Sequence, residues 1–295
     1  MVLYDATGSK IGVPVQSGTG SWGRNSGRAV FADDIYVYQS MSQNGGYDAD
    51  DIKYPKDPKV SWKCIRRFHP DGSSAPFSGG KGYDGAMLVI NTDPSDLRPA
   101  GVVVYNKELF VSDPVSSRIK VYNASTMAAT PLRSFATSNP GLLDYDREGF
   151  LWMMDVVQKK LIRFSTGGTV QAQSITFPAT VIPTSFCVDK VKDRILVTNN
   201  GEDQNVLIYS GIFDTPRQTA TFGYTGGINS GTAGAMAPLK FCEPKMGRHR
   251  FRGQYFCRKH LADGRRLSGE IPCHRCVAMA AQWADFYRHR RNKSR

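Results

Sequence analysis

The sequence lacks the features that define several common protein classes. No apolar run approaches the roughly 18 residues that a membrane-spanning helix needs. The first five residues, Met-Val-Leu-Tyr-Asp, contain neither a basic segment nor an apolar core, so no signal peptide is expected in this chain. We therefore expect no membrane contact. The sequence does not specify the cellular compartment, and a secreted or periplasmic parent protein is one option.

Motifs that carry enzyme chemistry are also missing. The sequence contains no Gly-x-Ser-x-Gly nucleophile elbow, no phosphate-binding Gly-Lys-Ser/Thr loop and no His-Glu-x-x-His zinc motif. His69 is the only histidine before position 245, and it precedes the turn signal Pro-Asp-Gly. That neighbourhood favours an exposed turn residue over a catalytic base.

Cysteine is sparse in the same region. Cys64 and Cys187 are the only cysteines before Cys242, and each stands in an apolar strand pattern. Their spacing suggests no disulfide framework, so we expect small buried hydrophobic side chains. Nothing in this part of the sequence calls for a cofactor.

The positive charge is concentrated at the C-terminus. The whole chain has a formal net charge of +12, but residues 245–295 hold 14 Lys and Arg against 3 Asp and Glu, and four of the five histidines. Residues 1–244 keep 24 basic and 23 acidic side chains, a net charge of +1. Any binding of nucleic acid would therefore depend on the basic tail alone.

An internal repeat of four short β-rich runs dominates the sequence. Phe110, Trp152 and Leu196 occupy equivalent positions in the second run, at spacings of 42 and 44 residues. A period of about 40–50 residues with four strands per unit is typical of a β-propeller. Runs such as Val-Val-Val at 102–104 show little alternation of polar and apolar residues, as expected where both faces of a blade are buried. The fold class predicted is all-β, an incomplete propeller of about four blades.

The repeat also predicts the domain organisation. Residues 1–26 would be the end of a preceding blade, and residues 224–244 a glycine-rich loop between blades. The four blades are expected at residues 27–99, with an insertion at 39–61, and at 100–139, 140–183 and 184–223. Because four blades do not close a propeller, we expect a fragment of a larger protein.

The repeat unit resembles the NHL repeat and, more loosely, the six-bladed gluconolactonase-like propellers. The shared order is Pro/Ala-Gly-Val, a turn, an aromatic-aliphatic strand, Asp, and then Arg-Ile-x-Val-Tyr, seen most clearly at 100–122. The resemblance covers about residues 2–223. Gluconolactonase-like propellers hold one divalent metal in the central channel through Glu, Asn and Asp, and the nearest candidates here are Asn199, Asn200 and Asp203. No matching Glu is found in the other blades, so that motif is not met.

Asp113, Asp155 and Asn199 recur at the end of the second strand of successive blades. One interpretation is structural, with these side chains bonding backbone amides in the following turn. The other is a ligand site on the rim. The recurrence favours the structural role, because a ligand site would break the symmetry of the repeat.

Asp48, Asp50 and Asp51 lie close together in the insertion. Three carboxylates on one loop could hold calcium, which takes six to eight oxygen ligands. The loop lacks the glycine and the terminal glutamate of an EF-hand, so a solvated loop is favoured.

The tail has two interpretations. Cys257, His260, Cys273 and Cys276 have the spacing of a four-ligand zinc site, and the surrounding arginines would then contact phosphates in a small nucleic-acid-binding module. Alternatively, the tail is translated in a shifted reading frame. When its possible codons are read one nucleotide later, they are compatible with the sequence expected at the start of a further blade. We expect nucleic acid as a partner only if the tail is genuine.

The function predicted is that of a non-catalytic propeller scaffold that binds a ligand or a protein partner on its rim. A propeller hydrolase or lactonase with one divalent metal is the alternative from another class. A zinc-dependent nucleic-acid-binding tail is the third.

Overall fold

The chain is an all-β protein. The computed structural model describes residues 3–4, 10–12, 28–44, 61–82, 84–93, 95, 97–233, 237–250, 254–258 and 271–272. The only helical element in these residues is one turn of 3-10 helix, η1 (Gly227–Asn229). No helix in the described ranges has both the length and the apolarity required to cross a membrane.

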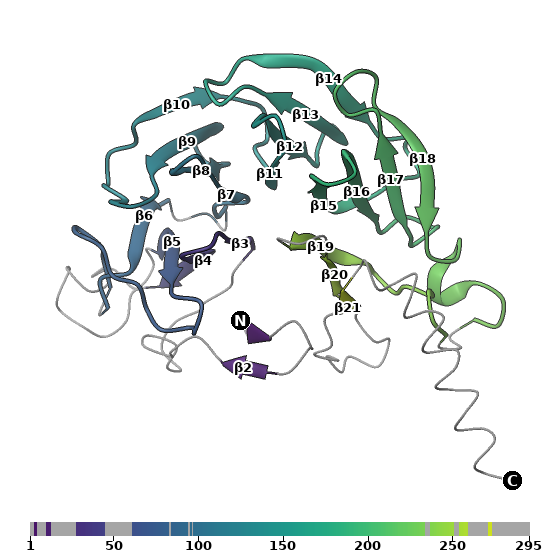
Figure 1. Ribbon diagram of the computed structural model, residues 1–295, viewed down its shortest axis with the longest axis horizontal. Helices are drawn as coiled ribbons and strands as arrows, with labels where there is room; N and C mark the ends of the chain where they lie inside the picture. The colour runs from purple at the N-terminus through teal and green to yellow at the C-terminus, as the bar shows by residue number, and fades with distance from the viewer. Residues whose placement is uncertain are drawn as a thin grey trace, which may run out of the picture. The chain divides into compact units, whose positions relative to one another are not determined.

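Four four-stranded antiparallel sheets follow one another along the chain, in the arrangement of propeller blades (Figure 1). In each sheet every strand pairs with its neighbour in sequence. The first two blades are β3 (Val30–Ala32), β4 (Val37–Asn44), β5 (Ser61–Phe68) and β6 (Met87–Asn91), then β7 (Val102–Tyr105), β8 (Glu108–Asp113), β9 (Arg118–Asn123) and β10 (Arg133–Ala136). The next two are β11 (Leu143–Tyr145), β12 (Leu151–Asp155), β13 (Lys160–Phe164) and β14 (Val170–Thr176), then β15 (Pro183–Asp189), β16 (Arg194–Asn199), β17 (Val206–Ser210) and β18 (Arg217–Phe222). The predicted fold class is confirmed.

Local sequence accounts for the tight hairpins inside the blades. Tyr105 pairs with Glu108 across a two-residue turn, and the turn residues Asn106 and Lys107 both have positive φ, 48° and 63°. Two consecutive residues with positive φ are typical of the type I′ turn, whose twist matches that of the flanking strands. Asn at the first position accepts this conformation at low cost.

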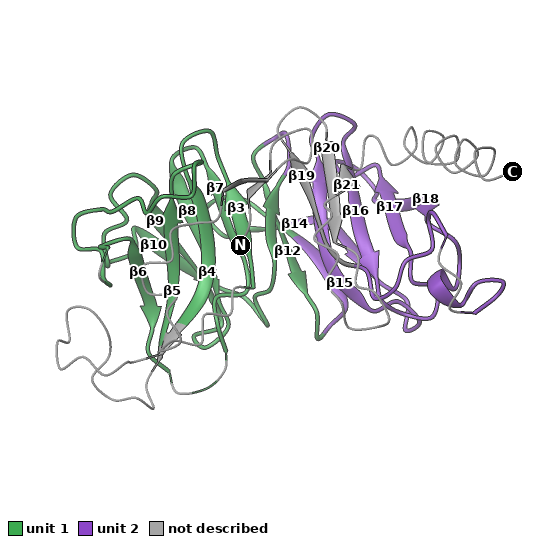
Figure 2. Ribbon diagram, turned by 90° about the horizontal axis from the view of Figure 1, so that it is seen from below, with its two compact units in different colours: residues 1–145, 149–157, 163–170 green, residues 146–148, 158–162, 171–295 purple. Residues whose placement is uncertain are grey.

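Contact clustering divides the chain into two compact units, coloured separately in Figure 2. Unit 1 comprises residues 1–145, 149–157 and 163–170, and unit 2 comprises residues 146–148, 158–162 and 171–295. Unit 1 holds the complete blades β3–β6 and β7–β10, and unit 2 holds the blade β15–β18. The strands of the blade β11–β14 are divided between the two.

The core of unit 1 lies between its two complete blades. Tyr38 and Ile65 of the first blade belong to one buried cluster with Leu109 and Tyr122 of the second, and each of these side chains is at most 2% exposed. Strand β8 is buried on both faces, since Leu109, Phe110 and Val111 are all fully buried. Burial of both faces explains why such strands show no polar-apolar alternation.

Strand β4 reaches Asn44, so the second strand of the first blade continues over the first residues of the expected insertion. Residues 45–60 lie outside the described ranges. At the N-terminus, β1 (Leu3–Tyr4) and β2 (Lys10–Gly12) form a two-stranded antiparallel sheet.

The beginning of the basic tail forms a three-stranded antiparallel sheet of β19 (Lys245–Arg250), β20 (Gln254–Arg258) and β21 (Ile271–Pro272). Strand β19 lies beside β15 and β16. Just before it, the hydroxyl of Thr184 in β15 donates a hydrogen bond of 2.6 Å to the carbonyl of Pro244. The loop at 224–244 therefore leads back to the first strand of the blade β15–β18.

Candidate functional site

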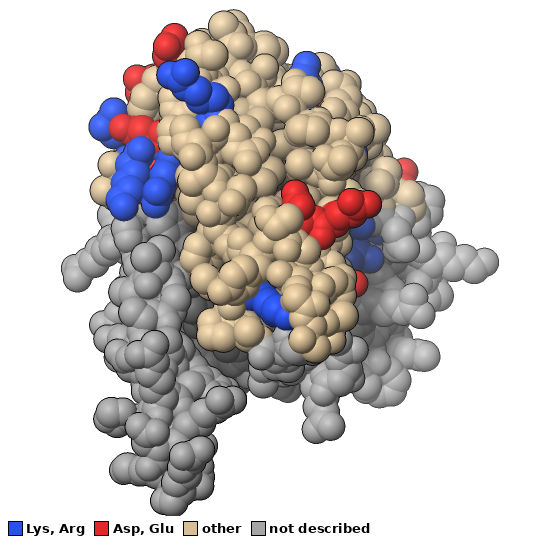
Figure 3. Space-filling model, turned by 90° about the vertical axis from the view of Figure 1, so that its right-hand side faces the viewer, with Lys and Arg blue, Asp and Glu red and all other residues tan. Residues whose placement is uncertain are grey.

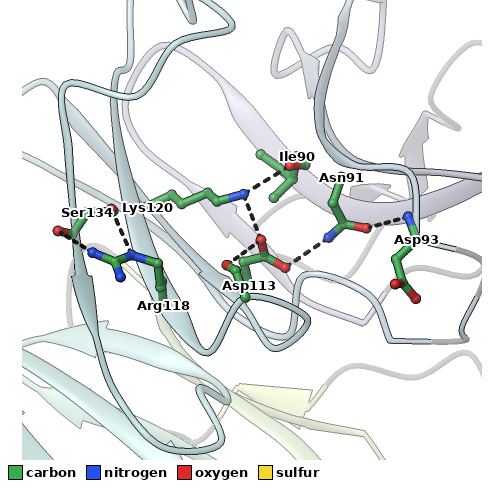
Figure 4. A network of polar contacts seen from close by, with 8 residues as sticks. Ile90, Asn91, Asp93, Asp113, Arg118, Lys120 and Ser134 are labelled. Carbon is green, nitrogen blue, oxygen red and sulfur yellow. Dashed lines mark hydrogen bonds and ion pairs between the residues drawn. The ribbon is translucent and has the colours of Figure 1, made fainter.

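The side chain of Asp113 occupies the centre of a polar network between the first two blades (Figure 4). Its Oδ1 accepts a hydrogen bond of 2.8 Å from Asn91 Nδ2, at the end of β6. Its Oδ2 accepts one of 2.8 Å from Ser116 Oγ and lies 2.7 Å from Lys120 Nζ. Lys120 in turn donates to the carbonyl of Ile90. The Asp113 side chain is 1% exposed, so its negative charge is compensated by Lys120 and by hydrogen bonds instead of by water.

Asp155 makes equivalent contacts in the next blade. Its Oδ1 accepts the backbone amide of Val157 at 3.0 Å. Its Oδ2 accepts Ser138 Oγ at 3.1 Å and Asn139 Nδ2 at 3.3 Å. Ser138 and Asn139 belong to the segment that enters this blade from β10.

Asn199 makes the corresponding contacts in the blade β15–β18. Its Oδ1 accepts the backbone amides of Ile182, at 3.0 Å, and of Gly201, at 2.8 Å. Its Nδ2 donates to Asn205 Oδ1 at 3.3 Å. Asn199 and Asn205 are 1% and 2% exposed.

Asp155 and Asn199 thus join the end of the second strand to the segment that enters the blade, whereas Asp113 joins it to the last strand of the preceding blade. The predicted bond to a backbone amide in the turn is confirmed for Asp155 and Asn199. Asp113 differs, since its hydrogen bonds in the structure come from side chains. Buried polar groups of this kind stabilise the fold when they are fully hydrogen-bonded.

The residues nearest to the metal motif of gluconolactonase-like propellers do not form a cluster of open oxygens. Asn199 Oδ1 is engaged by two amides. Asp203 is exposed, and its backbone carbonyl accepts the amide of Gly226. Asn200 is the exception, because its Oδ1 is buried and has no hydrogen-bond partner among the described residues.

No group of three or more His, Cys, Asp and Glu side chains suited to a metal ion occurs within the described ranges. Asp48, Asp50 and Asp51 lie outside those ranges, as do His260, Cys273 and Cys276. Cys257 lies in β20, of which the backbone is described. The candidate calcium and zinc ligands therefore stay predictions.

The thiols before position 242 are placed as predicted. Cys64 is fully buried and Cys187 is 2% exposed, and both pack in hydrophobic clusters. Burial raises the pKa of the Cys64 thiol to about 12, so this thiol stays protonated at neutral pH and is a poor nucleophile. His69 lies in the expected turn but is half-buried, with its ring 5.5 Å from the ring of Tyr36.

An aromatic cluster in unit 1 has no counterpart among the sequence predictions. Tyr105 ends β7 and Tyr145 ends β11, with ring centroids 4.9 Å apart and ring planes inclined at 47°. Phe31, in β3, lies 6.4 Å from Tyr145 at 56°. All three side chains are half-buried. The recurrence of aromatic residues near the end of the first strand was the only signal in the sequence.

Charged side chains are spread over the face of the molecule shown in Figure 3. On the face shown in Figure 3, basic and acidic residues stand in small groups with uncharged surface between them. This distribution agrees with the near-neutral composition of residues 1–244.

Comparison with known proteins finds solved structures that are similar to this chain, but it identifies no family. A scan against protein-family models finds no match, and no curated protein matches significantly. A virginiamycin B lyase from Staphylococcus aureus is 8% identical, with a TM-score of 0.48, over 81% of this chain and 68% of that chain. A putative 6-phosphogluconolactonase from Bacteroides uniformis is 12% identical, with a TM-score of 0.47, over 83% and 85%.

A chain of the mitotic checkpoint complex is 10% identical, with a TM-score of 0.50, over 88% of this chain and 78% of that chain. At this identity the likeness concerns the fold alone. It agrees with the four-stranded blades described above, and neither the fold nor the likeness specifies an activity.

Proposed function

We propose that this chain is a non-catalytic β-propeller scaffold that binds a ligand or a protein partner, and that it belongs to a larger protein. The observation that carries the proposal is the state of Asn199, one of the three residues nearest to the metal motif. Its Oδ1 accepts two backbone amides and its Nδ2 bonds Asn205, so the side chain serves the fold. The repeated residues Asp113 and Asp155 support the same interpretation, because their carboxylates are also engaged within unit 1.

A hydrolase or lactonase with one divalent metal is the second candidate, and one observation favours it. Asn200 Oδ1 is a buried acceptor with no hydrogen-bond partner in the described part of the chain. A buried acceptor of this kind is costly unless water, a ligand or a cation satisfies it.

Metal analysis combined with an activity assay distinguishes the two candidates. The purified full chain would be analysed for calcium, zinc and other divalent metals, and assayed for hydrolysis of a panel of sugar lactones. The scaffold proposal expects less than a stoichiometric amount of metal and no turnover. One equivalent of a divalent metal, with turnover that is lost in Asn200→Ala, would overturn it. Bound zinc without turnover would instead support the zinc-dependent tail.

A further inference from the structure

Three sulfur-bearing side chains gather on one face of the first blade, whose strands β4, β5 and β6 are neighbours in one sheet (Figure 1). Met41 in β4 pairs directly with Cys64 in β5, and residues opposite one another in a sheet have Cβ atoms about 5 Å apart. Cys64 also pairs with Val89 in β6, so Met87, two residues before Val89, lies diagonally across from Cys64 on the same face. Diagonal neighbours are within reach of long side chains. The three sulfur-bearing residues belong to one packed cluster with Trp62.

The cluster is shielded from water. Cys64 is fully buried, Met87 is 1% exposed and Met41 is 3% exposed. Thiol and thioether sulfurs are weak hydrogen-bonding groups, so their burial costs little free energy. Their lone pairs are also polarisable, which makes them ligands for a soft cation.

The first blade departs from the repeat at this point. Ser40 and Ser112 occupy equivalent positions, because each donates its backbone amide to the residue just before the first strand of its blade. Met41 therefore stands where the second blade has Asp113, and Cys64 stands opposite it, where the second blade has an arginine. Since the other blades carry polar side chains at this position, the sulfur pair is a feature of the first blade alone.

The number and charge of these ligands suit one class of metal ion. Thiolate and thioether sulfurs are soft ligands and favour copper(I), whereas carboxylate and carbonyl oxygens suit calcium and magnesium. One thiolate and two neutral thioethers carry a single negative charge, so a monovalent cation makes the complex neutral. A divalent ion would leave an uncompensated positive charge in a buried site, which is unfavourable.

From this arrangement we propose that Met41, Cys64 and Met87 form a three-coordinate copper(I) site inside the first blade. On binding, the S–H bond of Cys64 breaks, a copper–sulfur bond forms and the proton goes to solvent, while the two thioethers donate lone pairs. Copper and sulfur keep their oxidation states throughout. The site goes beyond the proposed function, because the scaffold is non-catalytic with or without copper.

The backbone at Gly82 lies directly over the Met87 thioether. Its φ is 83°, and a Cβ atom at this residue would lie 3.1 Å from Met87 Sδ. The chain can pass this close to the sulfur only because glycine has no side chain. Gly82 is half-buried, so it keeps contact with solvent. Copper therefore reaches the site by displacement of this short segment, without unfolding of the sheet.

NMR of the full chain with 13C-labelled methionine ε-methyl groups tests the proposal. The probe is silver(I), which has the charge and the soft-ligand preference of copper(I) and is stable in air. Silver is added in excess over the six cysteines, both to the folded chain and before refolding from urea, so that neither other thiols nor entry limits the result. We expect the Met41 and Met87 methyl resonances to shift together with silver and to stay in place with zinc. Resonances that ignore silver, or that respond equally to zinc, would overturn the proposal.

Three variants locate the site. Cys64→Ala should abolish both shifts. Cys187→Ala is the matched control and should keep them, because Cys187 is 2% exposed and packs in a cluster without methionine. Met41→Leu nearly conserves side-chain volume and should weaken the silver binding seen at Met87.

The remaining seven of the nine methionine resonances report whether each variant is folded. If Cys64→Ala does not fold, Met41→Leu carries the test, because a Leu in place of Met disturbs a core little. A Met87 shift that persists unchanged in either folded variant would show that the three sulfurs do not act together, and would overturn the site.

Discussion

At the scale of single residues, buried hydroxyls at one repeated position have different environments. Ser40 and Ser112 are both fully buried, and the backbone of each bonds the two residues that precede the first strand of its own blade. The hydroxyl of Ser40 accepts the amide of Ala29 at 2.8 Å. The hydroxyl of Ser112 has no partner among the described residues. The same hydroxyl group is thus hydrogen-bonded in one blade, whereas in the next it is buried without a partner among the described residues.

The two serines make a matched pair for mutation. Ser112→Ala removes a buried unsatisfied hydroxyl, so we expect a free energy of unfolding that is unchanged or raised by up to about 1 kcal/mol. Ser40→Ala leaves the amide of Ala29 without its acceptor and should lower the free energy of unfolding by about 1–2 kcal/mol. Urea titration of both variants is the measurement. A larger loss of unfolding free energy in Ser112→Ala than in Ser40→Ala would contradict the conclusion that the Ser112 hydroxyl is unsatisfied.

Glu108 and Arg133 form a pH-dependent pair in the second blade. Two hydrogen bonds, of 2.5 and 2.6 Å, join the carboxylate to the guanidinium, and they lower the pKa of Glu108. A carboxyl whose pKa is lower in the folded state stabilises the protein above its unfolded pKa of about 4.3, and this contribution is lost as the pH falls through the folded pKa. The pair is partly exposed, so its contribution is below about 1 kcal/mol.

We therefore expect Glu108→Gln to destabilise the protein at pH 7 and to have a progressively smaller effect as the pH falls from 5 to 3. Urea titrations at three pH values measure the difference. Glu202→Gln is the control, because Glu202 is exposed, and its effect should be small at every pH. An effect of Glu108→Gln that stays constant down to pH 3 would contradict the ion pair.

At the scale of elements, Arg67 in β5 joins the first two blades. Its guanidinium donates to the carbonyls of Ala75 and Pro76 in its own blade, and to those of Ala124 and Ser125 after β9, at 2.8–3.2 Å. The group lies 4.2 Å from the centroid of the Tyr36 ring. Arg67 is 3% exposed, so its charge is compensated by carbonyl dipoles and π electrons instead of by water.

Arg67→Lys should lower the free energy of unfolding by about 3 kcal/mol or more, since an ammonium cannot reach four carbonyls in a planar fork and its charge would be left poorly compensated. Thermal and urea unfolding would measure the loss. Arg217→Lys, at an exposed position in β18, is the matched control and should fall within about 0.5 kcal/mol of the parent. A similar small effect at Arg67 would show that its contacts are not maintained in solution.

At the scale of the whole molecule, charge separates the tail from the blades. Residues 245–295 hold nearly all of the net charge of +12, and residues 1–244 have a net charge of +1. Non-specific affinity for nucleic acid follows the number of phosphates neutralised and falls steeply with salt.

The full chain should therefore bind a single-stranded RNA oligonucleotide in a strongly salt-dependent manner, and removal of residues 245–295 should abolish this binding. Fluorescence anisotropy between about 50 and 200 mM salt measures both, over a range in which six or more phosphate contacts would cost about a thousandfold in affinity. Salt-dependent micromolar binding by residues 1–244 would contradict a tail-only interaction.

Much of each blade could be predicted from the sequence. The strands at 102–104, 151–154 and 195–197 are continuous apolar runs, and the turn residues between them are those that hairpins need. The role of Asp155 and Asn199 followed from their recurrence. The sequence did not predict the fourth strand of the first blade, Met87–Asn91, because the long segment 69–86 separates it from β5.

The sequence by itself determined what depends on near neighbours: the four-stranded unit, its period, the burial of Cys64 and Cys187, and the hairpin turns. Only the tertiary structure decided what depends on neighbouring blades. The meeting of Phe31 with Tyr145, and of Arg67 with carbonyls 57 and 58 residues away, requires the register of separate sheets. The physical reason is that strand patterns record which faces are buried, whereas contacts between blades depend on how those faces are aligned.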